Sequence, residues 1–95
     1  PIAIEGDLYW IAQEALNNVR KHAAAQHVAV HLHYTAATIS LAVVDDGVGF
    51  DPQAVPVEGR GGLRTIAERA ARVGGKLTYE SAPGKGTRVK VEVTI

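Results

Sequence analysis

The centre of the chain reads ISLAVVDDGVGF over residues 39–50. Its first half alternates apolar with other side chains, which predicts a strand with one buried face that ends at Asp45. Two glycines, Gly47 and Gly49, follow that carboxylate. A carboxylate at a strand end can accept a hydrogen bond from an adenine amino group, and glycines let the backbone come close to a flat base. An ordinary strand-ending turn would carry the same residues, so this segment alone does not decide between the two.

The chain before this segment predicts a helix followed by another strand. The helix covers residues 7–24, with Asp7 as its N-cap. Its apolar side chains recur at i, i+3 and i+4 and form one stripe: Leu8, Ile11, Ala12, Ala15, Leu16, Val19 and Ala23. Residues 28–34 alternate between two kinds of side chain and predict a half-buried strand. Its apolar face would consist of Val28, Val30, Leu32 and Tyr34.

The chain after residue 45 predicts a long loop, a second helix and a hairpin. The loop covers residues 46–62, and the helix covers residues 63–73 before a stop at Gly74-Gly75. Strands at 76–81 and 87–95 flank a turn at 82–86, and four side chains of the last strand would face inward: Val89, Val91, Val93 and Ile95. The order α-β-β-loop-α-β-β over a single domain, residues 1–95, indicates an α+β fold. We expect a two-layer α/β sandwich, with an antiparallel or mixed sheet covered on one face by helices.

The first predicted helix carries a polar cluster opposite its apolar stripe. The cluster consists of Glu14, Asn17, Asn18 and Lys21. A carboxylate and an amide oxygen one turn apart suit Mg²⁺ or its bound waters, and a lysine one turn further along suits a phosphate oxygen. A solvated polar helix face would have the same composition.

Two glycine-rich segments lie in the second half of the chain. Gly59-Arg60-Gly61-Gly62-Leu63 precedes the second helix, where glycines allow a hinge and unpaired N–H groups can face a phosphate. The segment is not a dinucleotide fingerprint, because position 64 is arginine rather than glycine, and the chain has no P-loop. Pro83-Gly84-Lys85-Gly86-Thr87 fits a hairpin turn, and it also fits a binding loop that places the Thr87 hydroxyl beside a base.

Composition excludes several classes of function. Ten acidic residues balance ten basic ones, so no overall field attracts nucleic acid or an anionic membrane. The chain has no cysteine, which excludes disulfides, thiol catalysis and thiolate metal sites. No apolar run approaches the roughly 20 residues of a membrane span, and no signal peptide is visible. The absence of cysteine fits a cytoplasmic location, and because the chain starts at Pro1 rather than methionine, we expect it to be a piece of a longer protein.

The four motif segments occur in the order found in one ATPase superfamily. The chain resembles the gyrase, chaperone, histidine-kinase and MutL ATPases, with an asparagine-bearing helix, DxGxG after a strand, a glycine hinge before a helix and Gly-x-Gly-Thr before the last strand. Several segments are similar to the histidine-kinase branch that includes nitrate sensors and membrane-fluidity thermosensors: LY at 8–9, QEALNNV at 13–19, KHA at 21–23, DDGVGF at 45–50, GL at 62–63 and ER at 68–69. The resemblance covers nearly the whole chain.

The resemblance implies a Bergerat-type fold that binds ATP with Mg²⁺. By that resemblance, Asn18 would coordinate Mg²⁺, and Glu14 would orient a metal-bound or bridging water. The remaining roles follow in the same way: Lys21 on phosphate, Asp45 on the adenine amino group, Gly47 and Gly49 shaping the pocket, Gly61 and Gly62 hinging the lid, and Thr87 lining the base site. Asn17, Arg60 and Leu63 would complete the nucleotide-binding set.

The activity that the resemblance implies is histidine phosphorylation. The γ-phosphoryl group would pass to a histidine on a separate helical dimerisation domain of the same kinase, and from there to a response regulator. None of the four histidines of this chain, at 22, 27, 31 and 33, looks like that acceptor. Nucleic acid and direct membrane contact are not expected. An anti-sigma-like protein-serine kinase and a non-catalytic, nucleotide-responsive docking module remain as alternatives.

Three features depart from the family pattern. The family usually has a strand before the first helix, whereas only residues 1–6 precede it here. The lid, at about residues 51–60, is short. Trp10 occupies a position where the branch often has an arginine, and it would either dock a partner or pack under a neighbouring loop.

Overall fold

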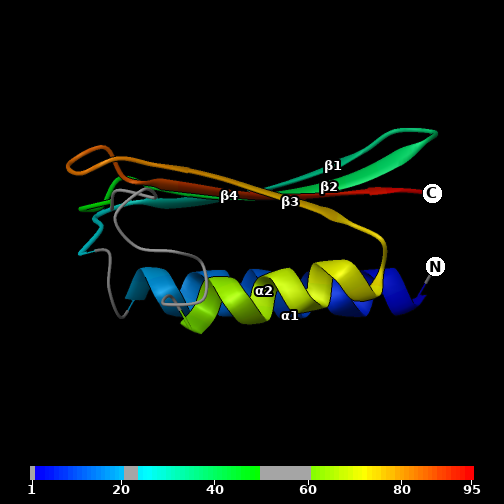
Figure 1. Cartoon of the computed structure of the whole chain (residues 1–95). Helices are drawn as coiled ribbons and strands as arrows, with labels where there is room; N and C mark the ends of the chain where they lie inside the picture. Colours follow the sequence, from blue (N-terminus) through cyan, green and yellow to red (C-terminus); the bar gives the residue numbers. More distant parts are fainter. Residues whose placement is uncertain (1, 21–23, 50–60) are drawn as a thin grey trace.

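Four strands form one antiparallel sheet, and two helices lie against a single face of it (Figure 1). The computed structural model describes residues 2–20, 24–49 and 61–95. The elements follow the predicted order: α1 Ile2–Asn18, β1 Val28–Tyr34, β2 Thr38–Asp45, α2 Gly61–Arg72, β3 Lys76–Ser81 and β4 Thr87–Thr94. The predicted two-layer α/β sandwich is confirmed. Among the described strands every pairing is antiparallel, so the sheet is not mixed.

The strand order is β1-β2-β4-β3, which places β2 and β4 in the middle of the sheet. Leu41 of β2 pairs with Leu32 of β1 on one side and with Val91 of β4 on the other. Because side chains alternate along a strand, these paired residues share one face of the sheet. In β4 the prediction holds for Val89, Val91 and Val93, which are buried, but it is wrong for Ile95, which lies beyond the strand and is 50% exposed.

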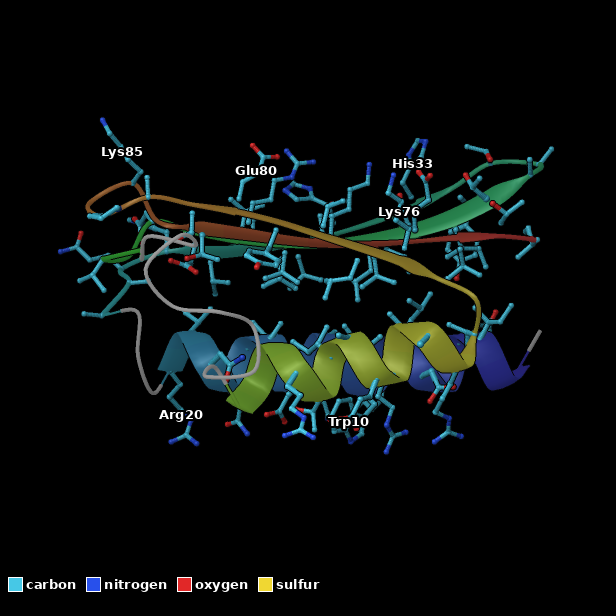
Figure 2. The ribbon with its side chains drawn as sticks, in the orientation of Figure 1. Trp10, Arg20, His33, Lys76, Glu80 and Lys85 are labelled. Atoms are coloured by element: carbon cyan, nitrogen blue, oxygen red, sulfur yellow. The ribbon has the colours of Figure 1, made fainter. Side chains whose placement is uncertain are left out.

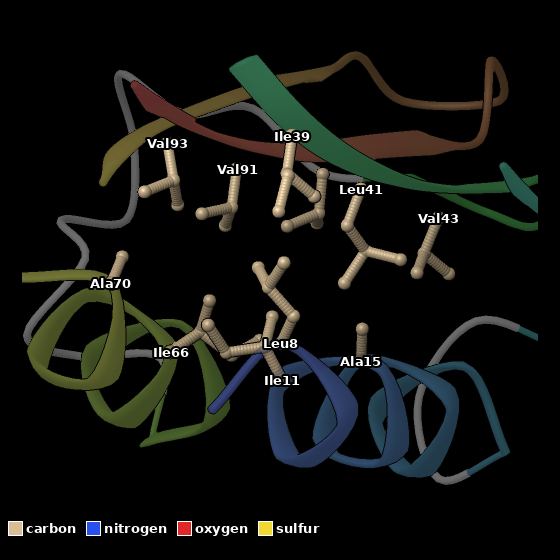
Figure 3. Packing of buried hydrophobic residues seen from close by; sticks show 11 residues of the cluster. Leu8, Ile11, Ala15, Ile39, Leu41, Val43, Ile66, Ala70, Val91 and Val93 are labelled. Carbon is tan, nitrogen blue, oxygen red and sulfur yellow. The ribbon is translucent and has the colours of Figure 1, made fainter. Parts of the chain in front are cut away.

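The core fills the space between the sheet and the helices (Figure 3). Leu8, Ile11 and Ala15 of α1 and Ile66 and Ala70 of α2 meet the inner side chains of β2 and β4. The largest fully buried side chains of the core are Ile11, Ile66, Val91 and Val93. Burying an aliphatic side chain of this size contributes about 1.5–3 kcal/mol, so the apolar stripes of both helices fix the helices to the sheet.

The first helix begins and ends earlier than the sequence predicts. It begins at Ile2, so Asp7 is not an N-cap. The Asp7 side chain is buried between the helices, with Oδ1 3.1 Å from Arg69 Nη1 and Oδ2 4.0 Å from Arg72 Nε. The partner lies 62 residues away in the chain, and for this reason the local pattern suggested a cap instead. The helix ends at Asn18 rather than near Ala24, whose φ of +49° is incompatible with a right-handed helix.

The edge strand β1 is more exposed than predicted. Val28, Val30, Leu32 and Tyr34 lie on the same face as the core but are 43–54% exposed. The helices explain the difference, since α1 packs on β2 and α2 packs on β3, whereas β1 lies at the edge of the sheet. Neither helix in the described part of the chain has the length and apolar character needed to cross a membrane.

Candidate functional site

The described parts of the four predicted motif segments lie toward the same end of the molecule (Figure 1). The C-terminal end of α1, the C-terminal end of β2, the first turn of α2 and the β3–β4 turn all lie at the left in this view. The antiparallel sheet accounts for this arrangement, because β2 ends where β4 begins and the β3–β4 turn connects at the same edge. The end of β2 and the β3–β4 turn, which are far apart in the sequence, therefore form one cluster.

Asp45 is the buried acidic group of this cluster. It is the last residue of β2 and is 8% exposed. Its Oδ1 accepts a 2.8 Å hydrogen bond from the backbone N–H of Gly47, and its Oδ2 has no donor among the described residues. Thr87 of β4 is its direct cross-strand partner, so the two side chains lie on the same face with Cβ atoms about 4.5–5.5 Å apart. The structure thus brings Asp45 and Thr87 together and leaves one carboxylate oxygen as an acceptor.

Two glycines hold the strand-end loop against the β3–β4 turn. Gly49 has φ +64°, and a Cβ at this position would overlap the carbonyl oxygen of Ala82. Gly86 has φ +75°, and a Cβ there would overlap the carbonyl oxygen of Asp45. The backbone N–H of Gly84 also donates to the carbonyl of Val48 over 2.7 Å. Only glycine allows the two motif segments to approach this closely.

Asp46 joins the start of this loop to the chain that enters β1. Its Oδ1 accepts 2.9 Å hydrogen bonds from the backbone N–H groups of Gln26 and His27, and its Oδ2 lies 3.0 Å from His27 Nδ1. Hydrogen bonds to the carboxylate, first that from the His27 backbone, hold the pKa of Asp46 below its ordinary value. The sequence showed two adjacent aspartates but gave no sign that the second one is an anchor.

Histidines on β1 do not gather into a metal site. His27 is engaged with Asp46, and His33 points away from the helices on the open face of the sheet (Figure 2). No group of three or more histidine, aspartate or glutamate side chains among the described residues is arranged to hold a metal ion.

The polar cluster of α1 lies at the end of the helix nearest the site. Glu14, Asn17 and Asn18 are half-buried, and Asn17 Oδ1 accepts a 2.9 Å hydrogen bond from Arg20 Nη2. Val19 and Arg20 follow in a short π-helical turn, a local widening that often marks functional sites and that the sequence did not predict.

Several predicted site residues are placed only in part or not at all. Gly61, Gly62 and Leu63 form the first turn of α2, whose N–H groups have no partner inside the helix. Lys21 and Arg60 lie outside the described residues, as does the lid predicted at 51–60.

The Trp10 side chain contacts other residues of this domain. Its side chain packs at the margin of the core, and the Arg69 guanidinium lies 4.3 Å from the centre of its ring. Figure 2 shows Trp10 on the side of the helical layer that faces away from the sheet. Arg69 also pairs with Asp7, so one arginine ties two residues of α1 to α2.

The sequence reasoning missed Ser81, the last residue of β3. Its Oγ donates a 2.9 Å hydrogen bond to the carbonyl of Gly86 and lies 2.8 Å from Thr87 Oγ1. A serine directly before a glycine-rich turn was the available signal, but serine is so common there that the pattern did not single it out.

Comparison with known proteins identifies the family. Residues 3–95 match the family described as histidine kinase-, DNA gyrase B- and HSP90-like ATPases. The chain is 43% identical to an uncharacterized sensor-like histidine kinase of Chloroflexus aurantiacus, over 97% of this chain and 16% of that protein. It is 39% identical to the sensor histidine kinase LiaS of Bacillus subtilis, over 97% of this chain and 25% of that protein. The chain therefore spans a quarter or less of the length of these relatives.

Solved structures agree with this assignment. The ATP-binding domain of PrrB from Mycobacterium tuberculosis superposes with a TM-score of 0.78 at 25% identity, over 94% of this chain and 67% of that chain. Full-length ShkA in complex with AMPPNP superposes with a TM-score of 0.77 at 25% identity, over 94% of this chain and 21% of that chain. The chain belongs to the family of histidine kinase-, DNA gyrase B- and HSP90-like ATPases.

Proposed function

We propose that this domain binds Mg-ATP and donates the γ-phosphoryl group to a histidine on a separate dimerisation domain of its kinase. The observation that carries the proposal is the buried carboxylate of Asp45 beside Thr87, at the end of the sandwich toward which the described parts of the four motif segments lie (Figure 1). In the cell, the phosphohistidine would pass its phosphoryl group to a response regulator in the cytoplasm.

The purine would lie at the sheet end of the cluster. Asp45 Oδ2 would accept a hydrogen bond from the exocyclic amino group of adenine, while Oδ1 stays bonded to Gly47. Thr87 would line the same side, and the backbone at Gly47 and Gly49 would contact the flat face of the base. The burial of Asp45 supports this role, because a shielded acceptor discriminates between bases more strongly than one in open water.

The triphosphate would extend toward the end of α1. Asn18 would coordinate Mg²⁺, with Glu14 holding a bound water, and both side chains are half-buried there. Mg²⁺ needs only one or two protein oxygens, since waters and phosphates complete its shell, so this donor set fits the ion. Asn17, Lys21 and Arg60 would contact phosphate oxygens. Gly61, Gly62 and Leu63 would supply the hinge and the helix N-terminus of α2.

Transfer would depend on how this chain positions the γ-phosphate. Phosphoryl transfer is governed mainly by alignment and charge stabilisation, and the bound Mg²⁺ would neutralise developing charge on the phosphate oxygens. The residues described here hold the nucleotide but offer no acceptor histidine. We therefore expect the isolated domain to bind nucleotide with little turnover.

Titration calorimetry with Mg-ATP tests the binding step. Asp45→Ala should weaken binding by roughly 1.5–3 kcal/mol, the value of a hydrogen bond to a charged group, which is about 10- to 150-fold in Kd. Glu80→Ala is the matched control, because Glu80 lies on the open face of the sheet (Figure 2) and should leave the Kd unchanged. Folded protein that takes up no nucleotide, or an Asp45→Ala variant with full affinity, would refute the proposal.

Phosphorylation of a dimerisation domain by labelled ATP tests the transfer step. Label on a histidine is lost in acid and kept in base. Acid-stable label would instead point to the protein-serine kinase, and binding without any transfer would point to the docking module.

A further inference from the structure

Ser81 belongs to a row of polar side chains that includes both proposed base-contacting residues. In the sheet, Thr87 of β4 pairs with Asp45 of β2 on one side and with Ser81 of β3 on the other. Residues directly opposite each other in antiparallel strands carry their side chains on the same face. The three polar side chains therefore lie side by side on the helix-facing side of the sheet, at the site end.

Hydrogen-bond donors and acceptors in this row can be assigned from the distances. The Ser81 hydroxyl has one proton, and its Oγ lies 2.9 Å from the Gly86 carbonyl, which can only accept, so Ser81 donates there. Ser81 Oγ also lies 2.8 Å from Thr87 Oγ1. Because the Ser81 proton is already engaged, Thr87 must donate its own proton in this contact. Thr87 then offers only lone pairs to any other group.

We infer that Ser81 is a positioning residue for base specificity, since it fixes Thr87 as a hydrogen-bond acceptor beside the carboxylate of Asp45. The inference rests on the proposed function. Two adjacent acceptors match a base with an exocyclic amino group, as in adenine. They oppose a base with a carbonyl oxygen at the same position, as in hypoxanthine, because that oxygen would face lone pairs on both sides.

The relative affinity for ATP and ITP tests this role, because the two nucleotides differ at that position of the base. In Ser81→Ala the Thr87 proton loses its partner and becomes free to donate to the hypoxanthine oxygen. We expect the affinity for ITP to rise and the affinity for ATP to change little. The preference for ATP should therefore fall about tenfold, which is the effect of one hydrogen bond. If Ser81 had a purely structural role, Ser81→Ala would weaken the binding of both nucleotides equally and leave the ratio of their Kd values unchanged.

Four further variants make the test specific. Ser81→Thr keeps the hydroxyl and should retain the wild-type ratio, whereas Ser81→Cys keeps the shape but accepts weakly and should shift the ratio in the same direction as Ser81→Ala. Ser40→Ala makes the same substitution in strand β2, on the opposite face of the sheet, and should have no effect on the ratio. In a Thr87→Val background, Ser81→Ala should no longer change the ratio, because the hydroxyl that Ser81 orients is gone.

The outcomes separate the inference from the proposed function. A wild-type protein that prefers ATP, together with folded Ser81→Ala and Ser81→Cys variants that keep its ratio, would overturn the inference alone. A wild-type protein that binds both nucleotides equally would also overturn the inference alone, whereas one that binds neither would overturn the proposed function and the inference with it.

Discussion

Replacing Gly86 by alanine is the sharpest test of how the site is assembled. Gly86 and Gly84 lie in the same turn, and both have positive φ, +75° and +78°. A Cβ at Gly84 would meet nothing within 4 Å, whereas a Cβ at Gly86 would overlap the backbone carbonyl of Asp45. The two alanine variants therefore share the same conformational penalty and differ only in the steric clash with β2.

The expected magnitudes follow from these two terms. A non-glycine residue in the left-handed region costs about 1–2 kcal/mol, and this is the whole effect expected for Gly84→Ala. Gly86→Ala adds a clash with backbone that the sheet holds in place, and overpacking of this kind costs about 1–3 kcal/mol more. The free energy of unfolding should thus fall by about 2–5 kcal/mol in Gly86→Ala, with a Tm at least about 8 °C below wild type for a domain of this size.

Urea unfolding of the wild type and both variants, combined with Mg-ATP titration, measures these effects. Gly86→Ala should also bind ATP at least tenfold more weakly, because relief of the clash displaces the backbone that carries the Asp45 side chain. Gly84→Ala should bind ATP like the wild type. Equal losses of stability in the two variants, or normal ATP binding in Gly86→Ala, would show that the close approach between the turn and β2 is not what shapes the site.

Two further substitutions test contacts that lie away from the base. The Asp46 carboxylate has a lowered pKa, so its contribution to stability is complete above the ordinary aspartate pKa of about 3.9 and is lost as the pH falls through the lower folded-state value. Urea unfolding at a series of pH values should therefore show the wild type more stable than Asp46→Asn at pH 7, and the difference should vanish in acid. A difference in stability that does not depend on pH would contradict this. Asp7→Ala should lower the free energy of unfolding by about 1–3 kcal/mol, because Arg69 loses a charged partner at the helix interface. Glu68→Ala removes an exposed ion pair within α2 and should cost about 0.5 kcal/mol or less, so equal effects of the two changes in urea unfolding would refute the importance of the Asp7 contact.

Most of the architecture could be predicted because the signals were local. Alternating side chains marked β2, β3 and β4, and the pair Gly74-Gly75 marked the end of α2, where Gly74 has φ +68°. The start of α1 could not be predicted in this way, because the partner that explains Asp7 is contributed by the other helix. The exposure of β1 likewise depends on where the helices lie relative to the sheet. The alternation of side chains along the strand does not carry that information.

The site shows the same division. Residue types and their order led to the prediction of four site segments, and the register that pairs Asp45 with Thr87 brings two of the predicted residues together. The anchoring role of Asp46 and the contacts of Ser81 depend on distances across strands and loops, so they became visible only in three dimensions. The ligand-binding and catalytic roles of all the predicted site residues stay predictions, and Lys21 and Arg60 also lie outside the described residues.

The strand order has a consequence for how such a domain can change. The proposed base-reading residues Asp45 and Thr87 belong to the two inner strands, each hydrogen-bonded on both sides, whereas the proposed phosphate contacts come from helix ends and their connections. Under the proposed function, recognition of the purine would thus rest on strands that are paired on both sides, and contacts to the phosphates would come from outside the sheet. Substitutions among the phosphate contacts could then alter phosphoryl transfer without changing the residues that select the base.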